Sequence, residues 1–392
     1  MAPIGESGAP VVDRTYFISR EIIALSCLPL DQSLMRSPLL AIVLLAVIPS
    51  LASPQTTRAP APTVPCTHAT TACERWIVFG AGPARTMVYA SYPLDGVNPR
   101  ITRALIMVHG AGRNADHYFE TAMAAAFLAN AMGNTIVIAP RFAQGHDSVA
   151  PNEILWASRE GNWRAGGTLP SSPALSSFAA VDEIVRRLAN KKVFPNLTKV
   201  VITGHSAGGQ FTTRYEMANR IDGTLGVTMS YVVANPSSYA WPTALRPLPA
   251  GDATPATAVN EALEPNGEKV HTNFTYGPFD STRAPGFDRW PAGLDSLTGY
   301  AASETPAQLR RQLATRPTTY LLGQVDVLPL GGFDSSPSAM AQGPTRRARG
   351  EAFAKFVTDS LGGHPNVIIV PECGHNDRCI FTTDVVFPAI FP

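Results

Sequence analysis

The sequence has little charge and no long hydrophobic run. Only 16% of its 392 residues are Asp, Glu, Lys or Arg, and the formal net charge is +1, which excludes a nucleic-acid-binding protein with a large basic field. The longest apolar run, Leu39–Ile48, has ten residues, whereas a membrane-spanning helix needs about 18 or more. Hydrophobic residues still make up 45% of the chain, which excludes a disordered protein. We therefore expect a globular protein with a large core and no stable membrane span.

The N-terminal region has the features of a signal peptide. Met35 begins a short basic segment, Leu39–Ile48 has the length of a signal-peptide hydrophobic region, and Ser50-Leu51-Ala52 fits a cleavage site. We interpret residues 1–52 as leader and signal peptide, with Met35 as the true start and cleavage after Ala52. The alternative is an N-terminal anchor that is never removed. Both interpretations place the body of the protein outside the cytoplasm, secreted or in the periplasm.

The cysteines agree with export. Cys27 falls in the leader, which leaves four cysteines that allow three pairings. Local pairings are favoured because short loops close readily in an oxidising compartment; they join Cys66 to Cys73 and Cys373 to Cys379. Residues 53–75 are then a Pro-rich linker followed by a disulfide-bearing segment. A second cluster of Cys and His at zinc-finger spacing is lacking in the sequence, so we expect no metal ion.

Residues 76–392 alternate buried strands with helices, which predicts an α/β domain whose mostly parallel sheet is covered on both faces. Short apolar runs predict the strands, which are Trp76–Gly80, Met87–Tyr92, Ala104–His109, Thr135–Ala139, Lys199–Thr203, Val227–Ala234, Thr319–Gly323 and Val367–Val370. The expected helices follow His109, begin at Ser172-Pro173 and at Ala207, and precede Gly362. Residues 235–317, rich in Pro and aromatic side chains, break this alternation. We expect an irregular insertion there, serving as a lid or as a structural loop.

One motif has the pattern of a catalytic nucleophile. Gly204-His205-Ser206-Ala207-Gly208 fits G-x-S-x-G, and it lies between a predicted buried strand and a predicted helix. Glycines on both sides permit a sharp turn that lifts the serine hydroxyl clear of the sheet. The following helix N-terminus favours developing negative charge. Ser206 is therefore the candidate nucleophile.

A serine nucleophile needs a base and an acid that orients the base. His375 follows the last predicted strand, in a loop that a disulfide between Cys373 and Cys379 would stiffen. Asp326 follows the strand before it and is the candidate acid, with Asp334 as the second candidate. The resulting chain order of serine, aspartate and histidine is that of the hydrolases with a nucleophile elbow.

The oxyanion of such a reaction needs two N–H donors. We expect them from Ala207, directly after the nucleophile, and from Ala111 in the loop after the strand that ends at His109, with Gly112 as the alternative. Residues 110–115 also fit the G-x-G-x-x-A pattern of dinucleotide-binding folds. The next predicted strand, however, ends in Pro140-Arg141 and offers no acid for a ribose. We therefore expect no organic cofactor.

Two further groups of side chains lie outside these motifs. Trp156 and Trp163 follow the strand that ends at Ala139, on the side where the carboxyl ends of strands build active sites. They are candidates for lining an acyl or aromatic substrate pocket, and the other role, which is the commoner one for tryptophan, is core packing. Arg346, Arg347 and Arg349 are expected to form a solvated helix face.

Together, His109-Gly110-Ala111-Gly112, Gly204–Gly208, Asp326 and Gly374-His375 resemble the α/β-hydrolase family, and within it a secreted esterase or lipase. The His-Gly-x-Gly loop and the C-terminal cysteine pair are similar to those of secreted feruloyl esterases and polyester depolymerases. The resemblance implies cleavage of a small or polymeric carboxylic ester through an acyl-enzyme. A peptidase or amidase with the same triad and a non-catalytic binding protein of this fold remain the alternatives.

Overall fold

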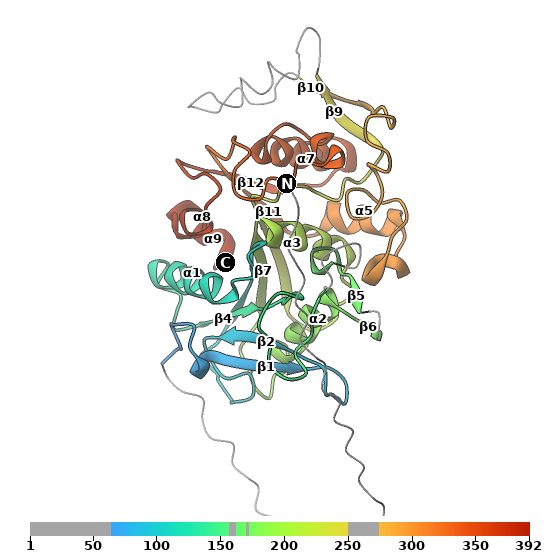
Figure 1. Cartoon of the computed structure of the whole chain (residues 1–392). Helices are drawn as coiled ribbons and strands as arrows, with labels where there is room; N and C mark the ends of the chain where they lie inside the picture. The colour runs from blue at the N-terminus through green and yellow to red at the C-terminus, as the bar shows by residue number, and fades with distance from the viewer. Residues whose placement is uncertain (1–63, 157–161, 170–171, 250–273) are drawn as a thin grey trace, which may run out of the picture. The chain divides into compact units, whose positions relative to one another are not determined.

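A computed structural model describes residues 64–156, 162–169, 172–249 and 274–392. The predicted signal peptide, Met35, most of the linker and the middle of the insertion lie outside these residues. The centre is an eight-stranded sheet in the order β1-β2-β4-β3-β7-β8-β11-β12 (Figure 1). Only β2 runs against its neighbours, so the prediction of a mostly parallel sheet is confirmed. The strands are β1 (Glu74–Val78), β2 (Arg85–Ala90), β3 (Arg103–Val108), β4 (Thr135–Pro140), β7 (Lys199–His205), β8 (Thr228–Ala234), β11 (Thr318–Gly323) and β12 (Asn366–Val370).

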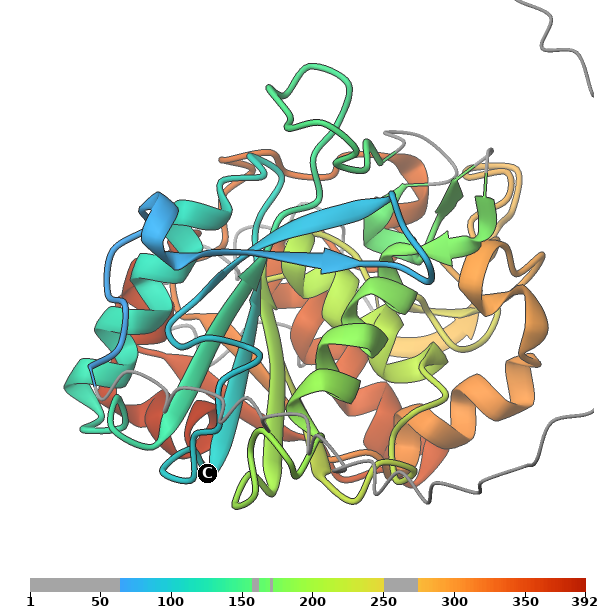
Figure 2. The ribbon, with the colours of Figure 1, turned by 90° about the horizontal axis from the view of Figure 1, so that it is seen from below.

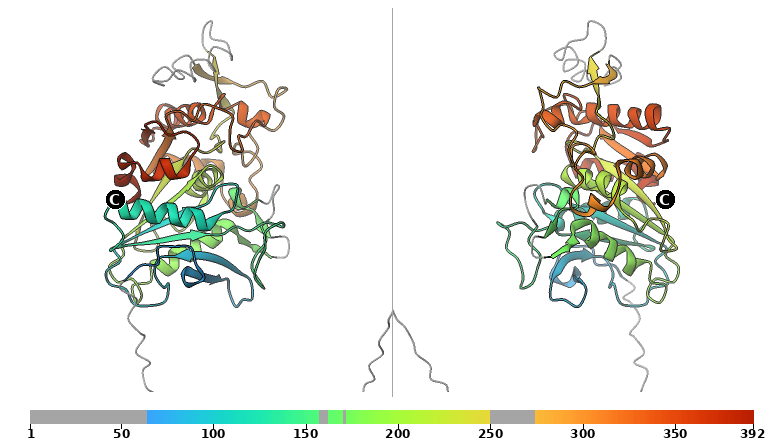
Figure 3. Two further views of the ribbon diagram at one scale, coloured as in Figure 1. Left: turned by 60° about the vertical axis from the view of Figure 1, so that its left-hand side comes forward. Right: turned by 90° about the vertical axis from the view of Figure 1, so that its right-hand side faces the viewer.

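Helices cover both faces of the sheet because successive strand residues point to opposite sides. In β3, Leu105 and Met107 pack in one apolar cluster, and Ile106 and Val108 pack in the other. The first cluster includes α1, α8 and α9, and the second includes α2, α3, α5 and α7. Figures 2 and 3 show α1 and α2 on opposite sides of the strands. The bounds are α1 (Ala115–Leu128), α2 (Ser177–Leu188), α3 (Ala207–Ala218), α5 (Pro306–Thr315), α7 (Arg346–Leu361), α8 (Asp377–Thr382) and α9 (Phe387–Ile390).

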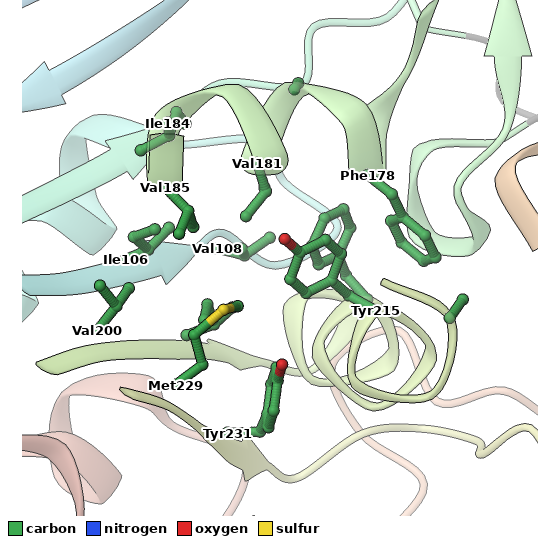
Figure 4. Packing of buried hydrophobic residues seen from close by; sticks show 14 of the residues in the cluster. Ile106, Val108, Phe178, Val181, Ile184, Val185, Val200, Tyr215, Met229 and Tyr231 are labelled. Atoms are coloured by element: carbon green, nitrogen blue, oxygen red, sulfur yellow. The ribbon is translucent and has the colours of Figure 1, made fainter. Parts of the chain in front are cut away.

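The core between α2, α3 and the sheet is continuous. The apolar stripe of α2, including Phe178, Val181 and Val185, faces Tyr215 of α3 and Ile106 of β3 (Figure 4). All of these side chains are fully buried. Burying one large apolar side chain contributes about 1.5–3 kcal/mol, so this layer fixes α3 firmly against the strands.

Helix α3 is buried along its whole length, including its acidic residue Glu216. Thr318 of β11 donates a hydrogen bond from its hydroxyl to Glu216 Oε1 at 2.5 Å. Arg316 donates to the Glu216 backbone carbonyl. Burial raises the pKa of Glu216 to about 8, because the charged form loses its hydration. The neutral acid therefore links α3 to β11.

Helix α2 begins later than the sequence predicts. Residues Ser172–Ser176 form β6, which pairs with β5 (Thr168–Leu169). The helix starts at Ser177 because the Ser176 hydroxyl accepts the Ala179 N–H and caps it. The Ser172-Pro173 pair thus lies in the strand that leads into the helix.

Residues 235–317, where we expected an irregular insertion, contain several short regular elements. The segment contains a β-hairpin of β9 (Leu245–Pro249) and β10 (Phe274–Pro278), a 3-10 helix at Gly299–Ser303, and α5. Thr305 and Gln308 form a capping box at the start of α5. Leu309 and Leu313 of this helix are buried against the core. Helix α5 is therefore part of the packed domain.

Both local disulfides are present in the structure, Cys66–Cys73 and Cys373–Cys379. The Cys66 N–H donates to the Ser91 carbonyl, so the first disulfide segment lies beside the strands. Among the described residues, no helix combines the length and the hydropathy needed to cross a membrane.

Candidate active site

Ser206 lies at a strained turn between β7 and α3. Its backbone has φ 59° and ψ −115°, a region that non-glycine residues seldom adopt. The flanking glycines make the turn possible: a Cβ on Gly208 would lie 2.2 Å from the Val108 carbonyl oxygen, and one on Gly204 would lie 2.5 Å from the Gly208 backbone. The sequence therefore brings α3 against the end of β3 and presents the Ser206 hydroxyl at the carboxyl edge of the sheet.

The three candidate triad side chains are joined by hydrogen bonds. Ser206 Oγ lies 3.0 Å from His375 Nε2, and His375 Nδ1 lies 2.8 Å from Asp326 Oδ2. They follow β7, β12 and β11, which lie in one half of the sheet (Figure 1). Asp326 is 2% exposed and Ser206 is 9% exposed. With the Nδ1 proton donated to the carboxylate, Nε2 is free to accept the serine proton.

The second candidate acid does not contact His375. Asp334 accepts a hydrogen bond from the Ser238 hydroxyl at 3.3 Å, and its backbone carbonyl accepts one from Arg349. The structure thus places Asp326, and not Asp334, at the imidazole.

The arginines at the start of α7 do not form a solvated face, so that prediction is wrong. Arg346, Arg347 and Arg349 are at most 4% exposed, because the first turn of α7 packs beneath the loop that carries Asp326. Arg346 Nη1 lies 3.4 Å from Asp326 Oδ1. Sequence spacing showed three cations on one helix, but the acid that pairs with Arg346 is supplied by another element.

The loop after β3 is anchored by His109. Burial lowers the pKa of His109 to about 4, so the ring is neutral. The Phe142 N–H donates to His109 Nε2 at 2.9 Å, and His109 Nδ1 lies 2.9 Å from the Gly110 carbonyl. Because Nε2 accepts, Nδ1 carries the proton and donates it to the loop. The sequence did not indicate this role.

Arg113 fixes the other side of the same loop. It has a left-handed φ of 58° and forms two hydrogen bonds to Asp147, at 2.7 and 3.0 Å. These bonds lower the pKa of Asp147 to about 2. Arg113 Nη1 also donates to the Ala111 carbonyl at 2.8 Å. The position of Ala111 is thus set by an ion pair as well as by His109.

A cleft of about 300 Å³ opens at Ser206 and His375. The loop 110–112 forms one wall, Gly331 and Gly332 form another, and Tyr118 and His205 also line it. Ala111 therefore borders the cleft. Ala207 is the first residue of α3, so its N–H has no partner within the helix.

His205 lies against the candidate base. The two imidazole rings are 4.5 Å apart between centroids, and His205 is 3% exposed. Burial, and then the neighbouring His375, lower the pKa of His205 well below its usual value. Its Nδ1 is 3.2 Å from the Tyr118 hydroxyl. A neutral ring thus supports one side of His375.

Trp156 and Trp163 do not line the cleft, so the prediction of a tryptophan-lined pocket is not met. They are 2% and 1% exposed and belong to the core. Trp163 stacks on Phe142 with the planes 15° apart and packs edge-to-face with His109, their ring centroids 4.7 Å apart. Trp156 packs edge-on against Phe142. Their packing supports His109 from behind.

A model of the alpha/beta hydrolase family matches residues 105–387, and the chain belongs to this family. A poly(3-hydroxybutyrate) depolymerase from Bordetella parapertussis is 19% identical with a TM-score of 0.54, covering 78% of this chain and 83% of that one. Poly(aspartic acid) hydrolase-1 from Sphingomonas sp. KT-1 is 20% identical with a TM-score of 0.54, covering 81% and 98%. No curated protein sequence matches this chain.

Proposed function

We propose that this protein is a serine hydrolase of carboxylic esters, with Ser206 as nucleophile, His375 as general base and acid, and Asp326 as the orienting acid. One observation carries the proposal: the hydrogen-bonded line from Ser206 Oγ through the imidazole to Asp326 Oδ2, at 3.0 and 2.8 Å. A hydroxyl in this arrangement is activated by the adjacent base. The relatives of similar fold include enzymes named for the hydrolysis of polymers.

The reaction has two acyl-transfer steps. His375 Nε2 takes the Ser206 proton while the oxygen attacks the ester carbonyl, and the protonated imidazole then gives this proton to the departing alcohol. Water, deprotonated by the same nitrogen, attacks the acyl-serine, and the carboxylic acid leaves as the proton returns to Ser206. The N–H groups of Ala111 and Ala207 hold the negative oxygen in both steps. Asp326 keeps Nδ1 protonated throughout.

The test uses p-nitrophenyl acetate and the matched acetyl p-nitroanilide. We expect the wild-type protein to cleave the ester and Ser206→Ala to lose at least about 1,000-fold in kcat. Tyr118→Phe, a loss of one hydroxyl at the edge of the same cleft, is the comparison for small structural changes. Ester cleavage by Ser206→Ala at the wild-type rate would overturn the proposal. Faster cleavage of the anilide than of the ester would assign the same triad to an amidase.

We also propose that the protein is exported and that residues 76–392 form the hydrolase domain. The two disulfides support this location, because disulfides persist in oxidising compartments. Fractionation followed by N-terminal sequencing tests it. We expect mature protein that begins at Ser53 in the medium or the periplasm, whereas a full-length cytoplasmic chain would contradict the proposal.

A further inference from the structure

Arg346 joins the candidate acid to the wall of the cleft. Its guanidinium is 0% exposed and makes three contacts through three different nitrogens. Nη1 lies 3.4 Å from Asp326 Oδ1, Nη2 donates to the Gly331 carbonyl at 2.9 Å, and Nε donates to the Ser237 hydroxyl at 2.9 Å. A planar guanidinium holds its donors in a rigid fork that reaches acceptors on different sides, whereas the donors of a lysine all lie on one rotatable nitrogen.

The position of this cation is unfavourable unless its partners compensate. Arg346 is the first residue of α7, whose first turn holds no acidic residue, and the positive end of the helix dipole disfavours a cation there. Burial also lowers the pKa of Arg346. The carboxylate of Asp326, itself 2% exposed, is the acidic group that acts most strongly on Arg346 in this dry environment, ahead of Asp334. Removing one member of such a buried pair leaves the other charge uncompensated.

The contacts divide the two oxygens of Asp326 between two partners. Oδ1 faces the guanidinium, and Oδ2 receives the Nδ1 proton of His375. The plane of the carboxylate is therefore fixed from both sides. Arg346 also holds Gly331, which lies close to the same imidazole on another side. A Cβ on Gly331 would lie only 3.2 Å from His375 Cδ2. The loop held by Arg346 thus packs against the ring that Asp326 orients.

We propose that Arg346 is a positioning residue for this reaction: it fixes the rotation of the Asp326 carboxylate and the loop at Gly331, and through both it holds His375 in line with Ser206. The inference rests on the proposed function. It predicts that Arg346 acts on catalysis chiefly through Asp326, so that its removal matters much less once that carboxylate is gone and only the contact with Gly331 remains.

The experiment is a double-mutant cycle with purified full-length protein and p-nitrophenyl acetate. Arg346→Met should lower kcat about 10- to 100-fold with KM within about 2-fold, because a poorly aligned base slows the chemical step. In the Asp326→Asn background the same substitution should cost less than about 3-fold, since the carboxylate is already lost and only the contact with Gly331 remains for it to remove. Circular dichroism and thermal melting check that each variant is folded.

Arg349→Met is the matched control. Arg349 lies on the same helix, is equally buried, and bonds to the carbonyls of Gly343, Ser237 and Asp334 without touching Asp326. We expect it to lower the melting temperature while leaving kcat within about 3-fold. If Arg346→Met does not fold, Arg346→Lys replaces it in the cycle, because one ammonium can restore only part of the three contacts.

Three results would overturn the inference: an unchanged kcat in the Arg346 variant, an equal loss in the wild-type and Asp326→Asn backgrounds, or a loss confined to KM. These results differ from a failure of the proposed function. That failure appears in the parent series, as wild-type protein without esterase activity or as Ser206→Ala with full activity. A wild-type enzyme that depends on Ser206 but is indifferent to Arg346 rejects the positioning role alone.

Discussion

Replacing Glu216 by Gln should change how the stability of the protein depends on pH. The folded protein holds this carboxyl with a pKa of about 8, against an ordinary value of 4.5, because burial in α3 penalises the charged form. Between pH 4.5 and 8, the folded protein therefore keeps a proton on Glu216 that the unfolded chain has already released. Stability contributed by this group is present below pH 4.5 and is lost as the pH rises toward 8. The difference between the two pKa values corresponds to at most about 5 kcal/mol in the free energy of unfolding.

The variant isolates this contribution because Gln keeps the shape of the side chain and cannot ionise. Its amide also retains an oxygen that can accept the Thr318 hydroxyl. We expect the free energy of unfolding of Glu216→Gln, measured relative to wild type, to increase by several kcal/mol between pH 5 and pH 9.

Urea denaturation followed by circular dichroism at five or six pH values measures the difference. Glu372→Gln, at an exposed position, is the matched control for the loss of one carboxylate. A difference between Glu216→Gln and wild type that stays constant over this pH range would refute the reasoning, because a buried carboxyl that remains neutral must make stability pH-dependent.

Three further predictions concern the site and its support. Gly208→Ala should cost at least about 3 kcal/mol of stability and most of the activity, because its Cβ would lie 2.2 Å from the Val108 carbonyl oxygen. Gly133→Ala is the control, since a Cβ there would meet open space, and equal melting temperatures of the two variants would contradict the prediction. Trp163→Phe should lower the melting temperature and leave KM within about 2-fold, since Trp163 is a core residue. A large rise in KM with an unchanged melting temperature would instead indicate that Trp163 contacts the substrate. Cys379→Ser should lower the free energy of unfolding by about 2 kcal/mol, because a short disulfide removes about this much loop entropy from the unfolded chain. It should also lower kcat by loosening the loop of His375, and unchanged stability and kcat would disprove both effects.

The elements that the sequence predicts well are those whose signal is local. A few neighbouring residues are enough to predict the central strands, from their apolar runs, and the turn at Ser206, from its flanking glycines. The order of strands along the chain also indicated which loops meet at the carboxyl edge of the sheet, and the three candidate triad residues were found there. Helix α5 carried a local signal as well, the capping box of Thr305 and Gln308, but the Pro-rich surroundings obscured it.

The features that the sequence could not reveal depend on partners far away in the chain. From the sequence alone, Arg346 is expected to be a solvated cation, whereas in the structure the loop after β11 brings Asp326 into contact with it. From the sequence alone, Trp163 is a candidate pocket residue, whereas in the structure it packs against Phe142 and His109. The neutral state of Glu216 follows from the burial of a whole helix, which the mixed polar and apolar residues of α3 do not indicate.

The contact between Trp163 and His109 has a consequence for engineering this protein. The imidazole of His109 touches the aromatic core on one side and bonds to the Gly110 carbonyl on the other. A change in core volume at Trp163 is therefore transmitted through one ring to the loop that carries Ala111. If the proposed function holds, we expect that repacking these aromatics to improve thermal tolerance will alter turnover as well, so both properties need to be selected together at these positions.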